Sequence, residues 1–134
     1  ATLKLAAAVG LGVATTVAVR RKTSKAQKSV VGYLQAQLGS PTTAYLSGAD
    51  DAGIVDRWAQ GDVRPDKLHW NRLRSAYDAT RLLVEAYDDQ TARSWFLGMN
   101  PTLNDESPAR ALRNSRNSRI WDDVVLAARE FAET

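Results

Sequence analysis

Residues 40–65 read SPTTAYLSGADDAGIVDRWAQGDVRP, and this stretch decides the fold because it holds the start and stop signals of two short helices. A serine-proline pair is typical of an N-cap and first helical residue, which predicts a helix from Pro41 to about Leu46 that stops at Gly48. Paired aspartates then cap a second helix that ends at Gly61. Two helices joined by so short a turn are typical of a helix-turn-helix.

Further helices are predicted on both sides of this stretch. Ser24 and Gln27 have the spacing of a capping box, and the helix that they start ends at Gly39. Downstream, apolar residues at helical spacing and a second serine-proline start predict helices over Lys67–Tyr87, Gln90–Leu97, from Pro108 onward and over Ile120–Ala132. No strand alternation of useful length follows Val19. We therefore expect an all-α fold of about seven helices without an internal repeat.

Composition excludes several classes of function. The chain has 134 residues, 44% of them apolar and 25% charged, which fits one folded domain. It contains no cysteine, so disulfides, thiol nucleophiles and sulfur-ligated zinc are excluded, and His69 is its single histidine. Each pair of adjacent acids falls at a predicted helix start, where the helix dipole explains it. We expect no enzyme activity, no cofactor and no metal.

Charge is distributed unevenly along the chain. Residues 1–48 hold six Lys and Arg and no acid, a net charge of +6, whereas residues 49–134 hold 12 Lys and Arg against 15 Asp and Glu, a net charge of −3. Such asymmetry is typical of an end that faces nucleic acid or a membrane. The charges between residues 20 and 28 could form an arm that contacts DNA, or a solvated linker: Arg20, Arg21, Lys22, Lys25 and Lys28.

An apolar run precedes these charges. Leu5 to Val19 contains 15 uncharged residues, fewer than the roughly 20 that a spanning helix needs. The strong positive charge follows the run, whereas a signal peptide carries it before the run. We therefore favour a segment that packs on the domain or on another copy over a membrane anchor, and we expect a cytoplasmic protein.

The central stretch resembles a known DNA-binding family. Tyr45 is the candidate inward residue of the first helix, residues 48–50 the turn, and Val55 and Trp58 the pair that locks the second helix. Together with the closing Gly61, this series resembles the recognition-helix end of the Xre/Cro helix-turn-helix family. The resemblance implies that the second helix lies in the DNA major groove.

Individual residues can then be assigned to DNA. The groove-facing positions would be Ala52, Gly53, Asp56, Arg57 and Gln60. Arg57 can donate two hydrogen bonds to guanine, and Gln60 can bond adenine in the same bidentate way. Thr42 and Thr43 begin the preceding helix and could hold a phosphate. Arg64 and Lys67 would add positive charge for contacts with the DNA backbone.

A second motif lies near the C-terminal end. Residues 95–112 read WFLGMNPTLNDESPARAL, which resembles the toxin-binding domain of the Xre/MbcA/ParS antitoxin family. That family usually has Gly-Gly where this chain has Asn104-Asp105, and Asn and Asp tolerate the left-handed conformation better than most residues. The resemblance implies a toxin or partner site built from Trp95, Asn100, Pro101, Leu103, Pro108 and Leu112.

The two resemblances occur in the family's order and cover about residues 26–134. They imply a homodimeric antitoxin that binds operator DNA, represses its own operon and neutralises a toxin, typically one with a RES domain that consumes NAD. We expect an N-terminal segment (1–25), a DNA-binding region (26–66) and a body for dimerisation and toxin binding (67–134). The alternatives are a phage immunity repressor or other stand-alone regulator, and a protein-interaction module that residues 3–19 tether to a membrane.

Overall fold

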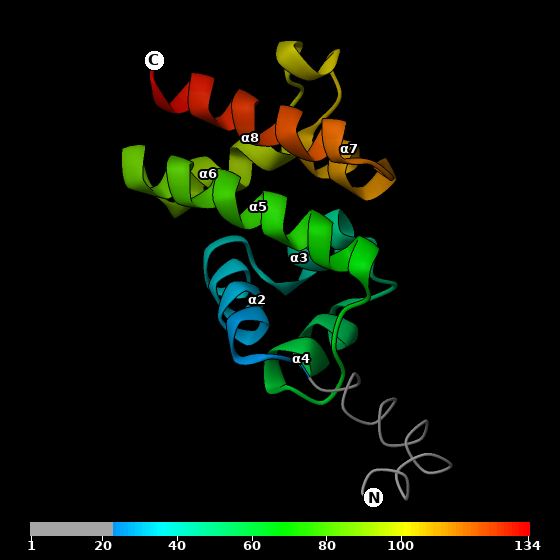
Figure 1. The fold of residues 1–134 in the computed structure, drawn as a ribbon. Helices are drawn as coiled ribbons and strands as arrows, with labels where there is room; N and C mark the ends of the chain where they lie inside the picture. Colours follow the sequence, from blue (N-terminus) through cyan, green and yellow to red (C-terminus); the bar gives the residue numbers. More distant parts are fainter. Residues whose placement is uncertain (1–22) are drawn as a thin grey trace, which may run out of the picture.

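The computed structural model describes residues 23–134, and this part of the chain is all-helical, as predicted (Figure 1). It contains seven α-helices, one 3₁₀ turn and no strand. In chain order these are α2 (Lys25–Leu38), α3 (Ser40–Ser47), α4 (Ala52–Gln60), α5 (Lys67–Ala86), α6 (Asp89–Leu97), η1 (Pro101–Leu103), α7 (Pro108–Asn114) and α8 (Ser118–Ala132). The predictions for the apolar run 5–19 lie outside the described residues. None of the described helices is both long enough and apolar enough to cross a membrane.

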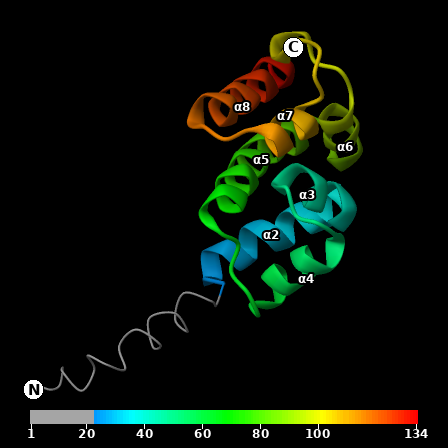
Figure 2. The ribbon, with the colours of Figure 1, turned by 90° about the vertical axis from the view of Figure 1, so that its right-hand side faces the viewer.

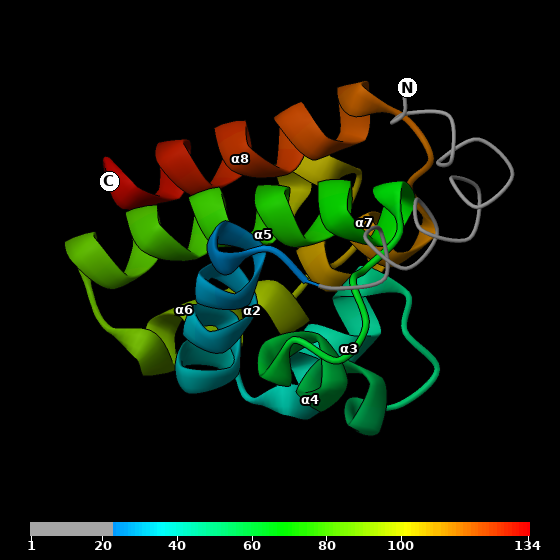
Figure 3. The same ribbon diagram turned by 60° about the horizontal axis from the view of Figure 1, so that its bottom comes forward.

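The long helix α5 lies at the centre of the arrangement. Figure 2 shows α2, α3 and α4 gathered on one side of α5, with α6, α7 and α8 on the other. Helices α5 and α8 lie side by side and run in the same direction, as Figure 3 also shows. Helix α2 packs against α3, α4, α5 and α6, and α3 also packs against α7. The two halves of the chain are therefore in direct contact.

Every helix contributes to a single hydrophobic core. Fully buried side chains include Leu34 of α2, Leu46 of α3, Val55 of α4, Leu73 of α5 and Phe96 of α6. They lie three, four or seven residues from other buried positions on their helices, which places them on one face. Burial of such a side chain contributes about 1.5–3 kcal/mol. Residues 26–66 and 67–134 thus share one core.

Most helix starts agree with the sequence. Ser24 and Gln27 form the predicted capping box, with reciprocal hydrogen bonds of 3.1 and 3.0 Å between side chain and backbone. Ser40 differs, because it is the first residue of α3 and its hydroxyl caps nothing. The residue before it, Gly39, has φ +89° and is the single residue that joins α2 to α3.

The loop after η1 adopts the backbone shape that the sequence predicts. Asn104 and Asp105 have φ values of +58° and +65°, so both occupy the left-handed region in place of glycine. The side chain of Asn100 accepts a 2.9 Å hydrogen bond from the amide of Thr102, and this starts the turn. Leu103 points inward and is buried, which fixes the loop to the core.

Candidate nucleic-acid interface

Helices α3 and α4 are joined by four residues, Gly48 to Asp51, in the order that the helix-turn-helix prediction requires. Val55 and Trp58 are buried against the core, as predicted for the locking pair. The predicted inward residue of α3 is wrong: Tyr45 is 42% exposed and Ala44 is buried in its place. The buried face of α3 is formed by Thr43, Ala44, Leu46 and Ser47, so Tyr45 falls on its solvent side.

The solvent face of α4 lies opposite its locking pair. Gly53, Arg57 and Gln60 are exposed and are spaced four and three residues apart, so they follow one stripe along the helix. The side chains of Arg57 and Gln60 form no hydrogen bond or ion pair with another described residue. A guanidinium and an amide are therefore both available on this face.

Asp56 is exposed on the same face of α4, three residues from Gly53 and four from Gln60. Its Oδ1 accepts a 2.7 Å hydrogen bond from Nε2 of Gln35 and lies 3.5 Å from the Ser40 hydroxyl. Asp56 thus stays on the side of α4 that the prediction assigns to the groove, with one carboxylate oxygen engaged by Gln35 of α2. Asp51 is engaged as well, since it caps α4 by accepting from the amide of Ile54 at 3.1 Å.

The two threonines of α3 differ in exposure. Thr43 is fully buried, its hydroxyl donates to the carbonyl of Gly39 at 2.8 Å, and its amide donates to the same oxygen at 3.1 Å. The phosphate contact predicted for Thr43 is wrong, because both of its donors are used inside the protein. Thr42 is partly exposed on the first turn of the helix, where it remains a candidate for phosphate.

The basic residues gather around the end of α4 and the loop that follows it. The Lys28 side chain lies against Gly61, which ends α4, so its charge is close to the negative end of the helix dipole. Arg64 and Lys67 line a groove of about 520 Å³ between this loop and the start of α2. Lys25 is exposed on the first turn of α2. The predicted contacts of Arg20, Arg21 and Lys22 lie outside the described residues.

Two arginines that sequence reasoning missed hold α3 in place. The buried Arg72 of α5 donates from Nη1 to the carbonyl of Ser47 at 3.1 Å and from Nη2 to the carbonyl of Ser115 at 2.7 Å. Burial lowers the pKa of the Arg72 guanidinium, and the charge of Arg116 lowers it further. The sequence does indicate that Arg72 faces inward, because it lies four and eight residues before Ala76 and Thr80, two small residues on the buried face of the same helix.

Arg113 of α7 reaches α3 from the other side. Its Nη1 donates to the carbonyl of Tyr45 at 2.8 Å, and its guanidinium lies 4.8 Å from the centre of the Tyr45 ring. Stacking of this kind is worth about 0.5–1 kcal/mol at an exposed site. The C-terminal half thus supports the helix-turn-helix through both Arg72 and Arg113.

Most of the predicted partner-binding residues belong to the core. Trp95, Leu103, Pro108 and Leu112 are buried, so their side chains offer no surface to a partner, and the prediction that they contact one is wrong. Their apolar side chains fill the space between α6, α7 and α8.

The same motif does present a surface that sequence reasoning missed. Pro101 is exposed and Asn100 is partly exposed at the start of η1. Leu97 and Met99 immediately precede them and are 62% and 80% exposed. Large apolar side chains are uncommon at such exposure in a cluster, and they mark a candidate contact surface.

Comparison with protein-family models, with curated proteins and with solved structures finds no match to this chain. Among residues 23–134 no group of three or more His, Asp or Glu side chains could hold a metal ion. The geometry of α3, α4 and their basic surroundings therefore carries the functional argument on its own.

Proposed function

We propose that this chain is a DNA-binding repressor of the antitoxin type that places α4 in the major groove of its operator. The observation that carries this proposal is the stripe of Gly53, Arg57 and Gln60 on α4, opposite the buried Val55 and Trp58. An α-helix fits the major groove, and Arg and Gln are the side chains that read guanine and adenine there in a bidentate way.

The surroundings of α4 supply the phosphate contacts that a DNA-binding protein also needs. Lys25, Lys28, Arg64 and Lys67 are exposed near the end of α4, and Thr42 lies on the first turn of α3. Contacts to phosphate fix the position of a protein on the duplex, whereas contacts to base edges determine specificity.

The test is the binding of a labelled duplex that carries the promoter of the chain's own gene, measured by fluorescence anisotropy at low salt. Arg57→Ala is expected to weaken specific binding by about 1–3 kcal/mol and to relax the preference over a scrambled duplex. Arg110→Ala is the matched control, because the side chain of Arg110 is 66% exposed on α7 and its nearest carboxylate is 3.6 Å away. A wild-type chain that does not bind the promoter at low salt overturns the proposal.

The antitoxin part of the proposal rests on the exposed Leu97, Met99 and Pro101 beside η1. A toxin partner, of the RES type in this family, would bury these apolar side chains. Co-purification with the product of the neighbouring reading frame tests this part, and Met99→Asp is expected to abolish it while DNA binding persists. If the product of the neighbouring reading frame is not toxic and does not co-purify, the chain is a stand-alone or phage repressor. If only DNA binding fails, the chain is a protein-interaction module.

A further inference from the structure

A groove runs along the seam between α5 and α8. The hydroxyl of Ser75 donates to the carbonyl of Trp121 at 2.7 Å, and the rings of Tyr87 and Phe131 are 5.6 Å apart, so the two helices stay paired along their length. Two adjoining hollows of about 280 and 230 Å³ follow this seam and share the residues Asp78 and Val125. They form one continuous groove on a face that no other described helix covers.

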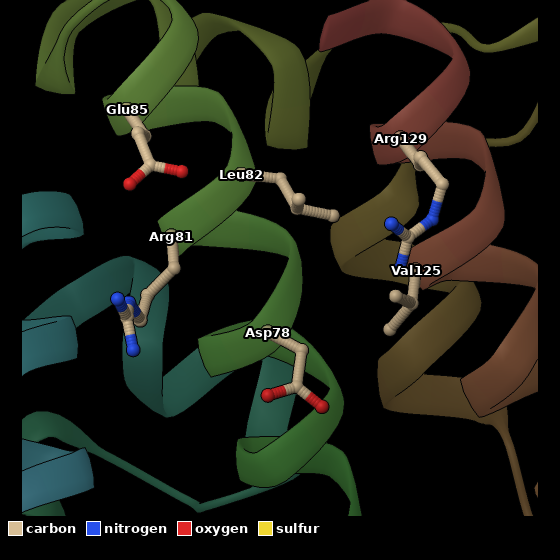
Figure 4. A pocket seen from close by; sticks show the side chains of 6 residues that line it. All are labelled: Asp78, Arg81, Leu82, Glu85, Val125 and Arg129. Carbon is tan, nitrogen blue, oxygen red and sulfur yellow. The ribbon is translucent and has the colours of Figure 1, made fainter.

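The floor of this groove is apolar and its edges are charged. In Figure 4 the side chains of Leu82 and Val125 reach toward each other across the seam, while the charged side chains project outward. Leu126 follows directly on α8 and is 50% exposed. An apolar strip with a charged border is typical of a surface that another helix pair covers.

The charges along the edges alternate in sign. On α5 the exposed stripe is Arg74, Asp78, Arg81 and Glu85, at spacings of four, three and four residues. On α8 Asp122 lies near one end of the groove and Arg129 near the other. If either helix is turned end to end, each acidic residue therefore takes the place of a basic one.

Alternating charges on one helix often pair with each other, but here they do not. No ion pair within 4 Å joins any of these six side chains to another described residue. Arg74 instead lies over the ring of Trp70 at 5.9 Å, and Arg81 over the ring of Tyr77 at 5.8 Å. The groove carboxylates are thus held in no short ion pair, and Glu85 interacts with Arg81 of the same helix only at longer range.

We propose that this groove is the interface with a second copy of the same chain. A symmetric dimer brings identical patches together, so its surface must be complementary to itself. When the two-fold axis lies in the interface and crosses α5 and α8 near their midpoints, α5 of one copy packs antiparallel on α5 of the other. Asp78 then meets Arg81, Arg74 meets Glu85, and Asp122 on α8 meets Arg129.

The same geometry brings the apolar strips into contact. Leu82 and Val125 lie between the charged residues and are covered by the same side chains of the second copy, whereas Leu126 lies outside the two hollows. The ion pairs define the register and orientation, and burial of the apolar strip stabilises the dimer. This interface goes beyond DNA recognition, because none of its residues belongs to α3 or α4.

The experiment uses two single variants of the full chain, Asp78→Arg and Arg81→Asp, in sedimentation velocity runs at micromolar concentration. Wild type is expected at twice the chain mass of 14.7 kDa. Asp78→Arg sets arginine against Arg81 and Arg81→Asp sets aspartate against Asp78, so each variant alone is expected to dissociate with a dissociation constant at least about tenfold higher.

An equimolar mixture of the two variants is expected to recover the dimer, because both contacts of the mixed pair then join opposite charges. In one contact arginine at position 78 faces aspartate at position 81, and in the other the native Arg81 faces the native Asp78. This recovery also shows that both variants are folded. Arg110→Asp on α7 is the control and is expected to stay dimeric. A wild type that is monomeric, single variants that dimerise like wild type, or a mixture that stays monomeric overturns the proposal. No DNA is present, so the proposed DNA-binding function fails or holds independently.

Discussion

The substitution of Gly48 by alanine tests the contact between the helix-turn-helix and the C-terminal half. Gly48 ends α3 with φ +88°, in the left-handed region, and a Cβ there would lie 2.2 Å from Nη1 of Arg72. Gly61 ends α4 at the same φ of +88°, but its Cβ would meet only the outer part of the exposed Lys28 side chain, with Cδ at 3.3 Å and Nζ at 3.5 Å. The two glycines therefore form a matched pair that differs in the neighbouring side chain.

The expected costs follow from these contacts. An alanine held in the left-handed conformation costs about 1–2 kcal/mol at either position. At Gly48 the guanidinium of Arg72 must also move, which breaks its hydrogen bond to Ser47, and a bond from a charged donor is worth about 1.5–3 kcal/mol. We expect a loss of unfolding free energy of about 3–5 kcal/mol for Gly48→Ala and about 1–2 kcal/mol for Gly61→Ala.

Urea unfolding followed by tryptophan fluorescence measures both variants, with the buried Trp58 of α4 as one of the reporting side chains. The double variant Gly48→Ala with Arg72→Met closes a thermodynamic cycle. In the Arg72→Met background, Gly48→Ala is expected to cost no more than Gly61→Ala. Equal costs for the two glycines in the wild-type background would refute the reasoning.

Three further results are expected. Trp58→Ala empties a buried position between α4 and the core and should lower the unfolding free energy by about 3–5 kcal/mol, measured in urea. Hydrogen bonds from Thr91 hold the pKa of Asp88 below its ordinary value of 3.8, so their stabilisation is present above that pH and is lost as the pH falls through the lower folded value. The melting temperatures of wild type and Asp88→Ala should accordingly differ at neutral pH and converge in acid. If the DNA proposal holds, Lys25→Ala should weaken binding to all duplexes and reduce the salt slope by about one.

Helix boundaries were predictable from the sequence because their causes are local. The capping box of Ser24 and Gln27, the cap at Asp51 and the stop at Gly61 each depend on residues within four positions of one another. The left-handed Asn104 and Asp105 were predictable for the same reason, since Asn and Asp tolerate that conformation better than most residues. These features need no knowledge of the distant parts of the chain.

Exposure was less predictable because it depends on distant segments. Thr43 has the character of a first-turn threonine, yet the packing of α3 buries it. Tyr45 has the position of an inward residue in the family pattern, yet it is exposed and stacks with Arg113 of the distant α7. The resemblance places Leu103 and Leu112 in a contact surface, whereas their apolar character reflects the core between α6, α7 and α8.

The groove on α5 also depends on a distant segment. Asp78, Arg81 and Glu85 have the pattern of an ordinary solvated helix face, and only the position of α8 beside them makes the face a groove. Arg72 is a similar case, because its two acceptor carbonyls, of Ser47 and Ser115, are 25 and 43 residues away along the chain. No spacing rule connects residues at such separation.

The position of α4 relative to the rest of the molecule depends on α3. Helix α4 packs chiefly on α2 and α3, whereas α3 also packs on α5 and α7. Arg72 and Arg113 donate to carbonyls near the C-terminal end of α3, where the helix dipole favours a positive charge. A change that moves α5 therefore reaches α4 through α2 as well as through α3, whereas one that moves α7 acts on α3. Since α5 also carries the proposed dimer groove, the spacing between two copies of α4 depends on how α2 and α3 pack on α5.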